Sequence, residues 1–244
     1  MEKSTVLVTG GASGIGLALA VRFLNAGCEV IICGRDKNKL RAAQEKHPTL
    51  HTRVCDLAIE AERSFLLNWT IKEFPKLNVL VNNAGIQRRV DLTKAEPWEQ
   101  TRRELLINVD APIHLAMLFI PHLMKQACPA IVNVTSGLSF SPLANVPVYS
   151  ATKAALHSFT LSLRHQLAAT PIKVVEIAPP AVNTDLGGPG LHTFGVDVNE
   201  FADAVMKRYE AGELEIGYGF SEKARLASRE ELNQIFNQMN AQTR

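Results

Sequence analysis

The chain has 244 residues, of which 46% are hydrophobic and 20% are charged, and its formal net charge is +2. This is the composition of a globular protein, and the length allows a sizeable core. The net charge is small and the sequence contains no basic run of five or more residues, so we expect no nucleic-acid partner.

The apolar content is not concentrated in a segment that would cross a membrane. The longest apolar stretch, APIHLAMLFIPHLM, spans residues 111–124 and contains two histidines and two prolines, so it is too short and too interrupted for a bilayer. A strand pattern begins at residue 5, which leaves no room for a signal peptide, and the four cysteines form no C-x-x-C pair. We therefore expect a cytoplasmic protein without membrane insertion.

Strand patterns alternate with helix patterns along the whole chain. Strands are predicted at 5–10, 29–34, 51–57, 78–85, 130–137, 173–180 and 213–219. Helices are predicted at 15–26, 36–46, 60–74, 97–125, 148–169, 199–211 and 228–240. The first six strands are mostly continuous β-branched runs, which is typical of strands buried on both faces of a parallel sheet. The sequence thus predicts an α/β fold, a single Rossmann-type domain over 1–244 with about seven strands and helices on both faces.

The first strand ends in a glycine-rich turn, TGGASGIG, at residues 9–16. Gly10, Gly14 and Gly16 favour a tight turn whose backbone approaches a pyrophosphate, and the helix that follows directs its N-terminus at the negative charge. Ser13 and Ile15 lie in the same turn. A glycine turn alone is weak evidence, but its place between the first strand and the first helix indicates a dinucleotide-binding site.

The end of the second strand indicates which dinucleotide is bound. An acidic residue there would hold the ribose 2′-hydroxyl of NAD, but the sequence has Gly34 followed by Arg35. A guanidinium can bind two phosphate oxygens, which favours NADP(H) over NAD(H). Asp36 is an unfavourable neighbour of a 2′-phosphate unless it begins the next helix and points away.

One helix turn separates Tyr149 from Lys153 in the segment NVPVYSATKAALHSF. Residues four apart lie on one helix face, so the ammonium and the phenol can be close together. This pair alone does not distinguish two surface residues from an acid–base pair.

Five motifs in order resemble the short-chain dehydrogenase/reductase family. They are TGGASGIG, NNAG at 82–85, Asn108 in INVDAP, Ser136 in VTSG, and Tyr149 with Lys153 in YSATK. The resemblance extends from about residue 5 to residue 219. Further phrases, such as VIICGR and TKAALHSF, are similar to a bacterial subgroup that includes the oxidoreductase encoded beside lipoteichoic-acid D-alanylation genes, which says little about the substrate.

The resemblance implies roles for four residues. Tyr149 would be the general acid that protonates the carbonyl oxygen, and Lys153 would hold the nicotinamide ribose. Ser136 would donate a hydrogen bond to the same substrate oxygen, and Asn108 would hold a water molecule next to Lys153. An ammonium about 5 Å from the phenol would favour the phenolate by roughly 3 kcal/mol, or about 2 pKa units, at an effective dielectric constant of about 20.

The resemblance also implies further cofactor contacts. They are expected at Asp56 and Leu57 beside the adenine, at Asn83, Ala84 and Gly85 beside the adenosine ribose, and at Pro179, Val182 and Thr184 beside the nicotinamide and phosphates. Most relatives have Pro-Gly where this chain has Pro179–Pro180. Proline fixes φ and has no N–H, so the resemblance does not predict the path of the chain at Pro180.

The substrate side is less specific. Leu138, Leu143 and Val146 are expected to line the pocket, together with a Gly-rich loop at 185–198 that we expect to act as a mobile lid. A C-terminal helical extension near 222–244 goes beyond the length of many relatives. No Cys/His cluster has metal-ligand spacing and His157 and His165 have no carboxylate partner nearby in sequence, so we expect no metal site.

The sequence therefore predicts an NADP(H)-dependent oxidoreductase that interconverts a small-molecule carbonyl and a secondary alcohol. Two alternatives remain: a non-catalytic NADP(H)-binding redox sensor, and an interaction protein that docks through its C-terminal extension. The resemblance also implies a homo-oligomer, a dimer or a tetramer.

Overall fold

Seven parallel strands form one sheet in the computed structural model, which describes residues 4–241. The strands are β1 (Thr5–Thr9), β2 (Glu29–Gly34), β3 (His51–Val54), β4 (Leu77–Asn82), β5 (Ala130–Val134), β6 (Lys173–Ala178) and β7 (Glu215–Gly217). Their order in the sheet is β3-β2-β1-β4-β5-β6-β7. Residues 1–3 of the expected domain, and residues 242–244 at the end of its C-terminal extension, lie outside the described residues.

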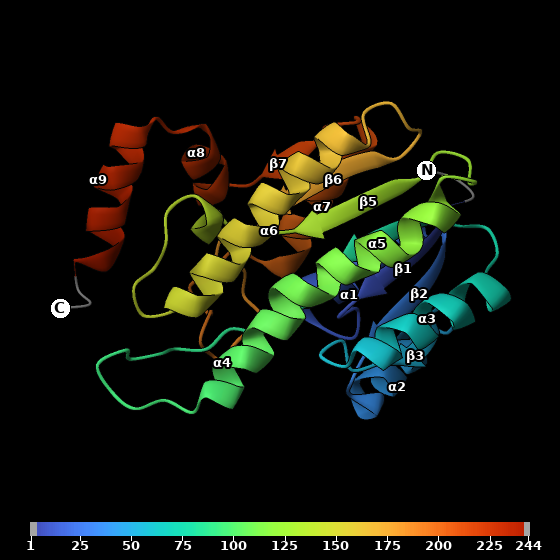
Figure 1. Cartoon of the computed structure of the whole chain (residues 1–244), viewed down its shortest axis with the longest axis horizontal. Helices are drawn as coiled ribbons and strands as arrows, with labels where there is room; N and C mark the ends of the chain where they lie inside the picture. Colours follow the sequence, from blue (N-terminus) through green and yellow to red (C-terminus); the bar gives the residue numbers. More distant parts are fainter. Residues whose placement is uncertain (1–3, 242–244) are drawn as a thin grey trace.

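Helices connect the strands and cover both faces of the sheet (Figure 1). The helices are α1 (Gly14–Asn25), α2 (Lys37–Lys46), α3 (Glu60–Glu73), α4 (Trp98–Leu105), α5 (Ala111–Leu123), α6 (Pro147–Gln166), α7 (Val198–Glu210), α8 (Phe220–Leu226) and α9 (Arg229–Asn240). Two short turns, η1 (Leu106–Asp110) and η2 (Gly137–Ser139), are π-helical and 3-10 respectively. The predicted doubly wound α/β fold is confirmed.

Alternate residues of each strand point to two separate cores. Val6 and Val8 of β1 pack with Phe23 of α1 and Phe201 of α7, whereas Leu7 packs with Phe119 of α5 on the other face. Both cores are apolar, which explains why the strands read as continuous hydrophobic runs.

The strand order reverses between β1 and β4. From β1 the chain proceeds to β2 and β3 on one side, and then returns to form β4 on the other side of β1. Ligands of open α/β sheets bind at such a point, beyond the carboxyl ends of the strands. The glycine-rich turn after β1 and the NNAG segment after β4 therefore emerge side by side.

Several predicted elements differ from the structure in their bounds. The helix expected at 97–125 is divided by the π-helical turn η1, because Asn108 in that turn bonds sideways to Ile86. An inserted turn of this kind leaves the apolar pattern continuous, so periodicity does not reveal it. The strands expected at 51–57, 78–85 and 130–137 each end three residues early, at Val54, Asn82 and Val134. The strand expected at 213–219 is shortened to Glu215–Gly217, and α8 was not predicted.

The helical run Trp98–Leu123 is the one segment among residues 4–241 that is long and apolar enough to cross a membrane. Only 39% of its most apolar part is buried. It nevertheless packs through α5 on α3, β4 and α6, in the manner of a core helix of an α/β protein.

A buried polar chain holds α6 against the centre of the sheet. Asn82 Nδ2 donates to Asn133 Oδ1 at 2.9 Å, and Asn133 Nδ2 donates to Thr160 Oγ1 at 2.9 Å. Asn133 is fully buried. Water therefore cannot replace these hydrogen bonds if one of the partners is removed.

We predict that Asn133→Ala lowers the free energy of unfolding by about 1–3 kcal/mol, because it leaves buried hydrogen-bonding groups on β4 and α6 without their partner. Urea unfolding followed by circular dichroism measures this change. The exposed Asn233→Ala on α9 is the control and should differ little from the unchanged protein. Equal stability of the two variants would contradict a structural role for the buried chain.

Candidate active site

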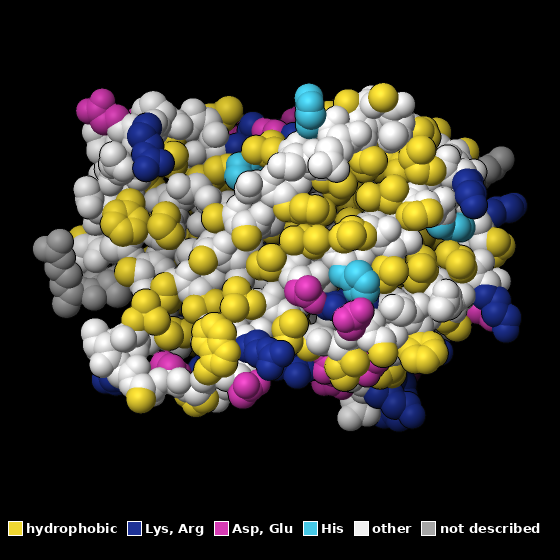
Figure 2. All heavy atoms as spheres, viewed as in Figure 1, with side chains coloured by type: hydrophobic (Ala, Val, Ile, Leu, Met, Phe, Trp, Pro, Cys, Tyr) yellow, Lys and Arg dark blue, Asp and Glu magenta, His cyan; other side chains and the backbone are white. Residues whose placement is uncertain are grey.

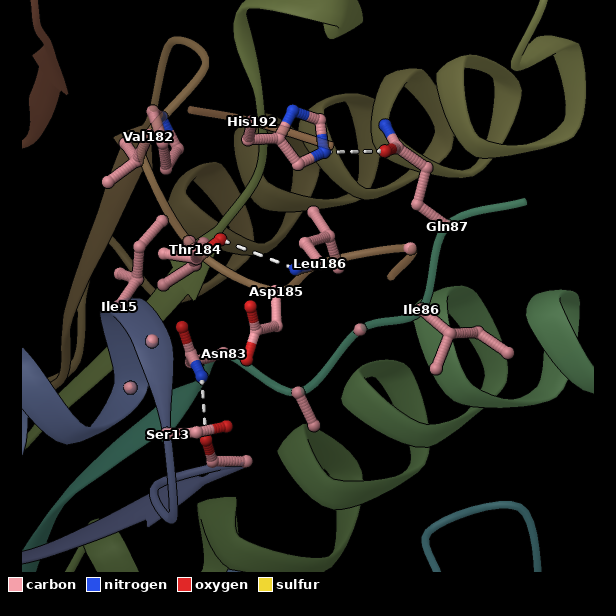
Figure 3. A pocket seen from close by; sticks show the side chains of 18 of the residues that line it. Ser13, Ile15, Asn83, Ile86, Gln87, Val182, Thr184, Asp185, Leu186 and His192 are labelled. Atoms are coloured by element: carbon pink, nitrogen blue, oxygen red, sulfur yellow. Dashed lines mark hydrogen bonds between the residues drawn. The ribbon is translucent and has the colours of Figure 1, made fainter. Parts of the chain in front are cut away.

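A cavity of about 1590 Å³ opens at the carboxyl ends of the strands, above the β1–β4 reversal. Figure 3 shows three of the segments that border it: the turn with Ser13 and Ile15, the segment from Asn83 to Gln87, and the segment from Val182 to His192. The cavity brings together most of the site residues expected from the sequence.

The glycine-rich turn leaves one end of the cavity free of side chains. Gly10 has φ +63°, and a Cβ atom there would lie 2.8 Å from the Cα atom of Ala84. Gly14 has φ +55° and faces Thr184. Ser13 precedes α1 but makes no side-chain cap, so its hydroxyl and the first amides of α1 remain open to the cavity. This arrangement fits a pyrophosphate at a helix N-terminus.

Thr9, which the sequence analysis did not single out, fastens the two strand ends together. Its hydroxyl accepts from the Asn83 amide at 2.9 Å and the Ala84 amide at 3.1 Å, and donates to Val81 O. The Asn83 side chain donates in turn to Thr9 O at 2.9 Å. Asn83, Ala84 and Gly85 thereby line the cavity beside the glycine-rich turn.

The end of β2 presents a capped carboxylate and an exposed guanidinium to the cavity. Asp36 begins α2, where its carboxylate accepts from the amides of Asn38 at 2.9 Å and Lys39 at 3.1 Å, so it is occupied as a helix cap. Arg35 is exposed at the cavity mouth. Lys39 and Lys46 line the same region and were missed, because helix-surface lysines carry no sequence motif.

Asp56 and Leu57 also border the cavity. Partial burial would raise the pKa of Asp56, but hydrogen bonds from Arg103 and from the Ala58 amide outweigh this and lower it. The Arg103–Asp56 contact is 2.6 Å long and joins α4 to the end of β3. Asp56 is thus held as a carboxylate.

The four proposed catalytic side chains are nearly inaccessible to solvent: Asn108 is 1% exposed, Ser136 7%, Tyr149 6% and Lys153 3%. Tyr149 and Lys153 lie one turn apart on α6, and Lys153 Nζ is 5.6 Å from the centroid of the Tyr149 ring. Lys153 Nζ donates to Val134 O at 2.8 Å, and Ser136 lies just beyond the same strand.

The electrostatics of this pair differ from the expectation that Lys153 lowers the pKa of Tyr149. Burial raises the pKa of Tyr149, against a smaller lowering by a hydrogen bond with Ser136, and Glu104 raises it further. Burial also lowers the pKa of Lys153 to about 8. Desolvation disfavours both charged forms, so in the protein without ligand it outweighs the attraction between ammonium and phenolate.

Glu104 is a further residue that sequence reasoning missed. It is fully buried in α4, and burial raises its pKa to about 7. The backbone and the positive charge of Arg88 oppose this rise only in part. Its contribution to the electrostatics of Tyr149 depends on the packing of α4 near α6, which no local motif reveals.

Asn108 uses its side chain to position the neighbouring segment. Its Oδ1 accepts from the Ile86 amide at 2.9 Å, and its Nδ2 donates to Ile86 O at 2.8 Å and to Thr152 Oγ1 at 3.1 Å. The side-chain amide therefore joins the segment after β4 to α6. A water molecule next to Lys153 remains a prediction.

Pro180 does not divert the chain from the cavity. Pro179 O accepts from the Gly137 amide at 2.9 Å, and Pro179, Val182 and Thr184 all border the cavity. Val182 pairs with Val196 in a single β-bridge, which closes the base of the loop at 185–198. His192 of this loop contacts Gln87 Oε1 at 3.1 Å across the cavity (Figure 3).

Two of the three expected substrate residues line the cavity and one does not. Leu138 and Leu143 border it, whereas Val146, the residue before α6, is buried and is not among the residues that line the cavity. A substrate contact of Val146 stays a prediction. Met239 of α9 borders the cavity instead.

His157 has a carboxylate partner that spacing did not reveal. Its Nδ1 lies 2.9 Å from Glu176, which is 1% exposed on β6 and also accepts from Thr135 Oγ1 at 2.6 Å. The hydrogen bond with Glu176 raises the pKa of His157. Within residues 4–241, no three His, Cys, Asp or Glu side chains are grouped so as to hold a metal ion.

Comparisons with known proteins agree with this geometry. The model of the short chain dehydrogenase family matches residues 4–191. The uncharacterized oxidoreductase DltE of Bacillus subtilis is 48% identical over 99% of this chain and 98% of its own length. An uncharacterized oxidoreductase of Staphylococcus saprophyticus is 30% identical over 77% of this chain and 82% of its own length.

Solved structures are similar over nearly the whole chain. A short-chain dehydrogenase from Sphingobium yanoikuyae in complex with NADPH has a TM-score of 0.81 at 25% identity, covering 99% of this chain and 96% of that one. The 3-ketoacyl-(acyl-carrier-protein) reductase of Brucella melitensis, complexed with NADH, has a TM-score of 0.82 at 28% identity, covering 90% and 99%. With its fold, its glycine-rich turn and its Tyr–Lys pair, the chain belongs to the short-chain dehydrogenase/reductase family of oxidoreductases, which bind NAD(P)H.

Proposed function

We propose that the protein is an NADP(H)-dependent oxidoreductase that interconverts a carbonyl and a secondary alcohol, with Tyr149 as general acid and base. The observation that carries this proposal is the buried Tyr149–Lys153 pair in a cavity whose other end is a glycine-rich helix N-terminus. The nicotinamide supplies or accepts the hydride when it is bound. We also propose that residues 1–244 act as one domain.

The side chains of this site divide the remaining work. In the reduction, Tyr149 gives its phenolic proton to the carbonyl oxygen, and Ser136 holds the same oxygen by a hydrogen bond. Lys153 would hold the nicotinamide ribose and, in its ammonium form, favour the phenolate left on Tyr149. A non-catalytic redox sensor would not need this pair, so the presence of both residues favours the enzyme.

The proposed preference for NADP(H) rests on charge at the end of β2. Arg35, Lys39 and Lys46 border this part of the cavity, and Asp36 is engaged as the cap of α2. A 2′-phosphate would find cationic side chains there and no unpaired carboxylate at that strand end. A related structure in complex with NADPH is compatible with this preference.

A homo-oligomer is proposed from the surface of α5 and α6. Hydrophobic side chains gather over these two helices in Figure 2, and Met117, Met124 and Leu161 are 66%, 43% and 41% exposed. A continuous apolar face of this kind is typical of a subunit interface. The protein would act on small molecules in the cytoplasm.

We expect Tyr149→Phe to lower turnover by at least about a hundredfold, because it removes only the proton donor. Binding of NADPH should change little. Turnover is followed by nicotinamide absorbance on a carbonyl substrate found by screening, and Tyr209→Phe, in the core away from the cavity, is the matched control. Near-normal turnover of Tyr149→Phe would assign the proton to another residue.

Arg35→Ala should reduce the preference for NADPH over NADH. We expect the wild-type protein to bind NADPH about 10- to 100-fold more tightly than NADH. This ratio corresponds to a difference in binding free energy of roughly 1.4–3 kcal/mol. Most of this difference should be lost in the variant and retained in Arg41→Ala, at an exposed position on α2, the helix that follows Arg35. Titration by calorimetry measures both constants, and a wild type that prefers NADH would exclude the assignment.

The lowered pKa of Lys153 should make stability depend on pH. An unfolded lysine titrates near pH 10.4 and the folded one at about 8, so between these values the unfolded chain binds more protons and stability rises with pH. The wild type should therefore gain about 2 kcal/mol relative to Lys153→Met between pH 7 and pH 9.5. The raised pKa of Tyr149 has the opposite effect, but only above about pH 10.

Urea unfolding of the cofactor-free protein at both pH values tests this prediction. Lys207→Met, at an exposed position on α7, is the control and should follow the pH dependence of the wild type. Parallel behaviour of the Lys153 and Lys207 variants would mean that Lys153 is not desolvated.

A further inference from the structure

Helix α9 lies outside the core but reaches back to the cavity. None of its residues is buried, and a capping box of Ser228 and Glu231 begins it. In Figure 1 it stands at the edge of the molecule, with the loop that follows β5 between it and α6. The helix therefore contributes little to the two cores, and its position calls for another explanation.

The end of α9 is fastened to that loop by one side chain. Asn240 Oδ1 accepts from the Ala144 amide at 2.7 Å, and Asn240 Nδ2 donates to Pro142 O at 3.1 Å. The same Nδ2 donates to Phe236 O at 2.8 Å, which ties it to its own helix. Asn240 thus pairs with both backbone groups that flank Leu143.

The two residues beside these contacts border the cavity. Leu143 does so from the loop, and its amide donates to Ser150 Oγ of α6 at 3.2 Å. Met239, the neighbour of Asn240, does so from α9. One side chain therefore links two apolar residues that border the cavity, and Leu143 is joined through Ser150 to the turn of α6 that carries Tyr149.

The half-buried residues of α9 agree with an orientation in which Met239 faces the cavity. Leu232, Ile235 and Met239 are half-buried at a spacing of three and four residues, which places them on one helix face. Asn237 is exposed on another face. The apolar stripe faces the body of the protein, and Met239 is its member nearest to the Asn240 contacts.

We propose that α9 is a wall of the substrate site, and that Met239, held in place by Asn240, limits the size of an apolar substituent on the substrate carbonyl. This inference rests on the proposed function and adds a substrate class, carbonyl compounds with an uncharged apolar group of limited bulk. The flexible thioether of methionine suits a wall that adapts to more than one such group.

Met239→Ala tests the wall directly. The panel is a series of methyl ketones with alkyl groups of increasing length and with a phenyl group, and the quantity is the ratio of kcat/KM for large and small members. We expect this ratio to rise about 10-fold or more, the scale of a few methylene groups in an apolar pocket. Asn237→Ala should leave the ratio unchanged, and all variants should bind NADPH as the wild type does.

Asn240→Ala tests the contacts of Asn240 with the loop after β5, and this test needs no measurement of turnover. Hydrogen exchange of the NADPH-bound protein should become faster at the Ala144 amide, because its acceptor is removed, and remain unchanged in Asn237→Ala. Unchanged exchange at Ala144, or the same size ratio in the Met239 and Asn237 variants, would overturn the inference.

Failure of the proposed function gives a different result. If the wild type binds NADPH but reduces no member of the panel, the proposed function is contradicted. Calorimetric titration of the same ketones into the NADPH-bound protein then tests whether Met239 limits the size of the bound group. A larger size limit for binding in Met239→Ala supports it. The same limit in both proteins, or no binding to either, overturns it.

Discussion

The hydroxyl group of Thr9 joins the two strand ends between which the site opens. It accepts from the amides of Asn83 and Ala84, and it donates to Val81 O. A parallel sheet places all carboxyl ends at one edge, but it does not fix the loops that leave that edge. Thr9 fixes two of them, and the contact of Gly10 with Ala84 leaves no room for a larger residue. The dinucleotide end of the cavity depends on this junction.

Burial has opposite effects on the two central groups of the site. It raises the pKa of Tyr149 and lowers that of Lys153, because a low-dielectric environment favours the neutral forms of both. The Val134 carbonyl, which accepts from Lys153 Nζ, partly offsets the cost of its charge. Pairs of titratable groups whose pKa values are shifted in different directions by their environments are typical of acid–base sites. With a pKa of about 8, Lys153 is still mainly an ammonium at pH 7, whereas the Tyr149 phenol is protonated.

The two ends of the cavity are built in different ways. The dinucleotide end consists of strand termini and short turns, held by hydrogen bonds between neighbouring strands. The proposed substrate end consists of segments far apart in sequence: Leu138 and Leu143 after β5, the loop at 185–198, and Met239 of α9. Side-chain hydrogen bonds join these segments to one another and to the segment after β4, such as His192 with Gln87 and Asn240 with Ala144. Substitutions can therefore alter the substrate end while the cofactor end is preserved.

The sequence by itself determined the features that depend on neighbours in the chain. Strand patterns predicted all seven strands, the first six as mostly continuous β-branched runs, and the glycine spacing predicted a turn without side chains after β1. The four-residue spacing of Tyr149 and Lys153 placed both on one face of α6. The order of these motifs identified the family.

Only the tertiary structure decided the features that depend on burial or on contacts between remote segments. Burial reversed the expected pKa shift of Tyr149, and the packing of α4 near α6 brought the charge of Glu104 close to it. Glu176 reached His157 from another strand, and Asn240 joined the C-terminal helix to Ala144. Sequence patterns report the local periodicity of polar and apolar residues, whereas desolvation and long-range hydrogen bonds arise only when the chain is folded.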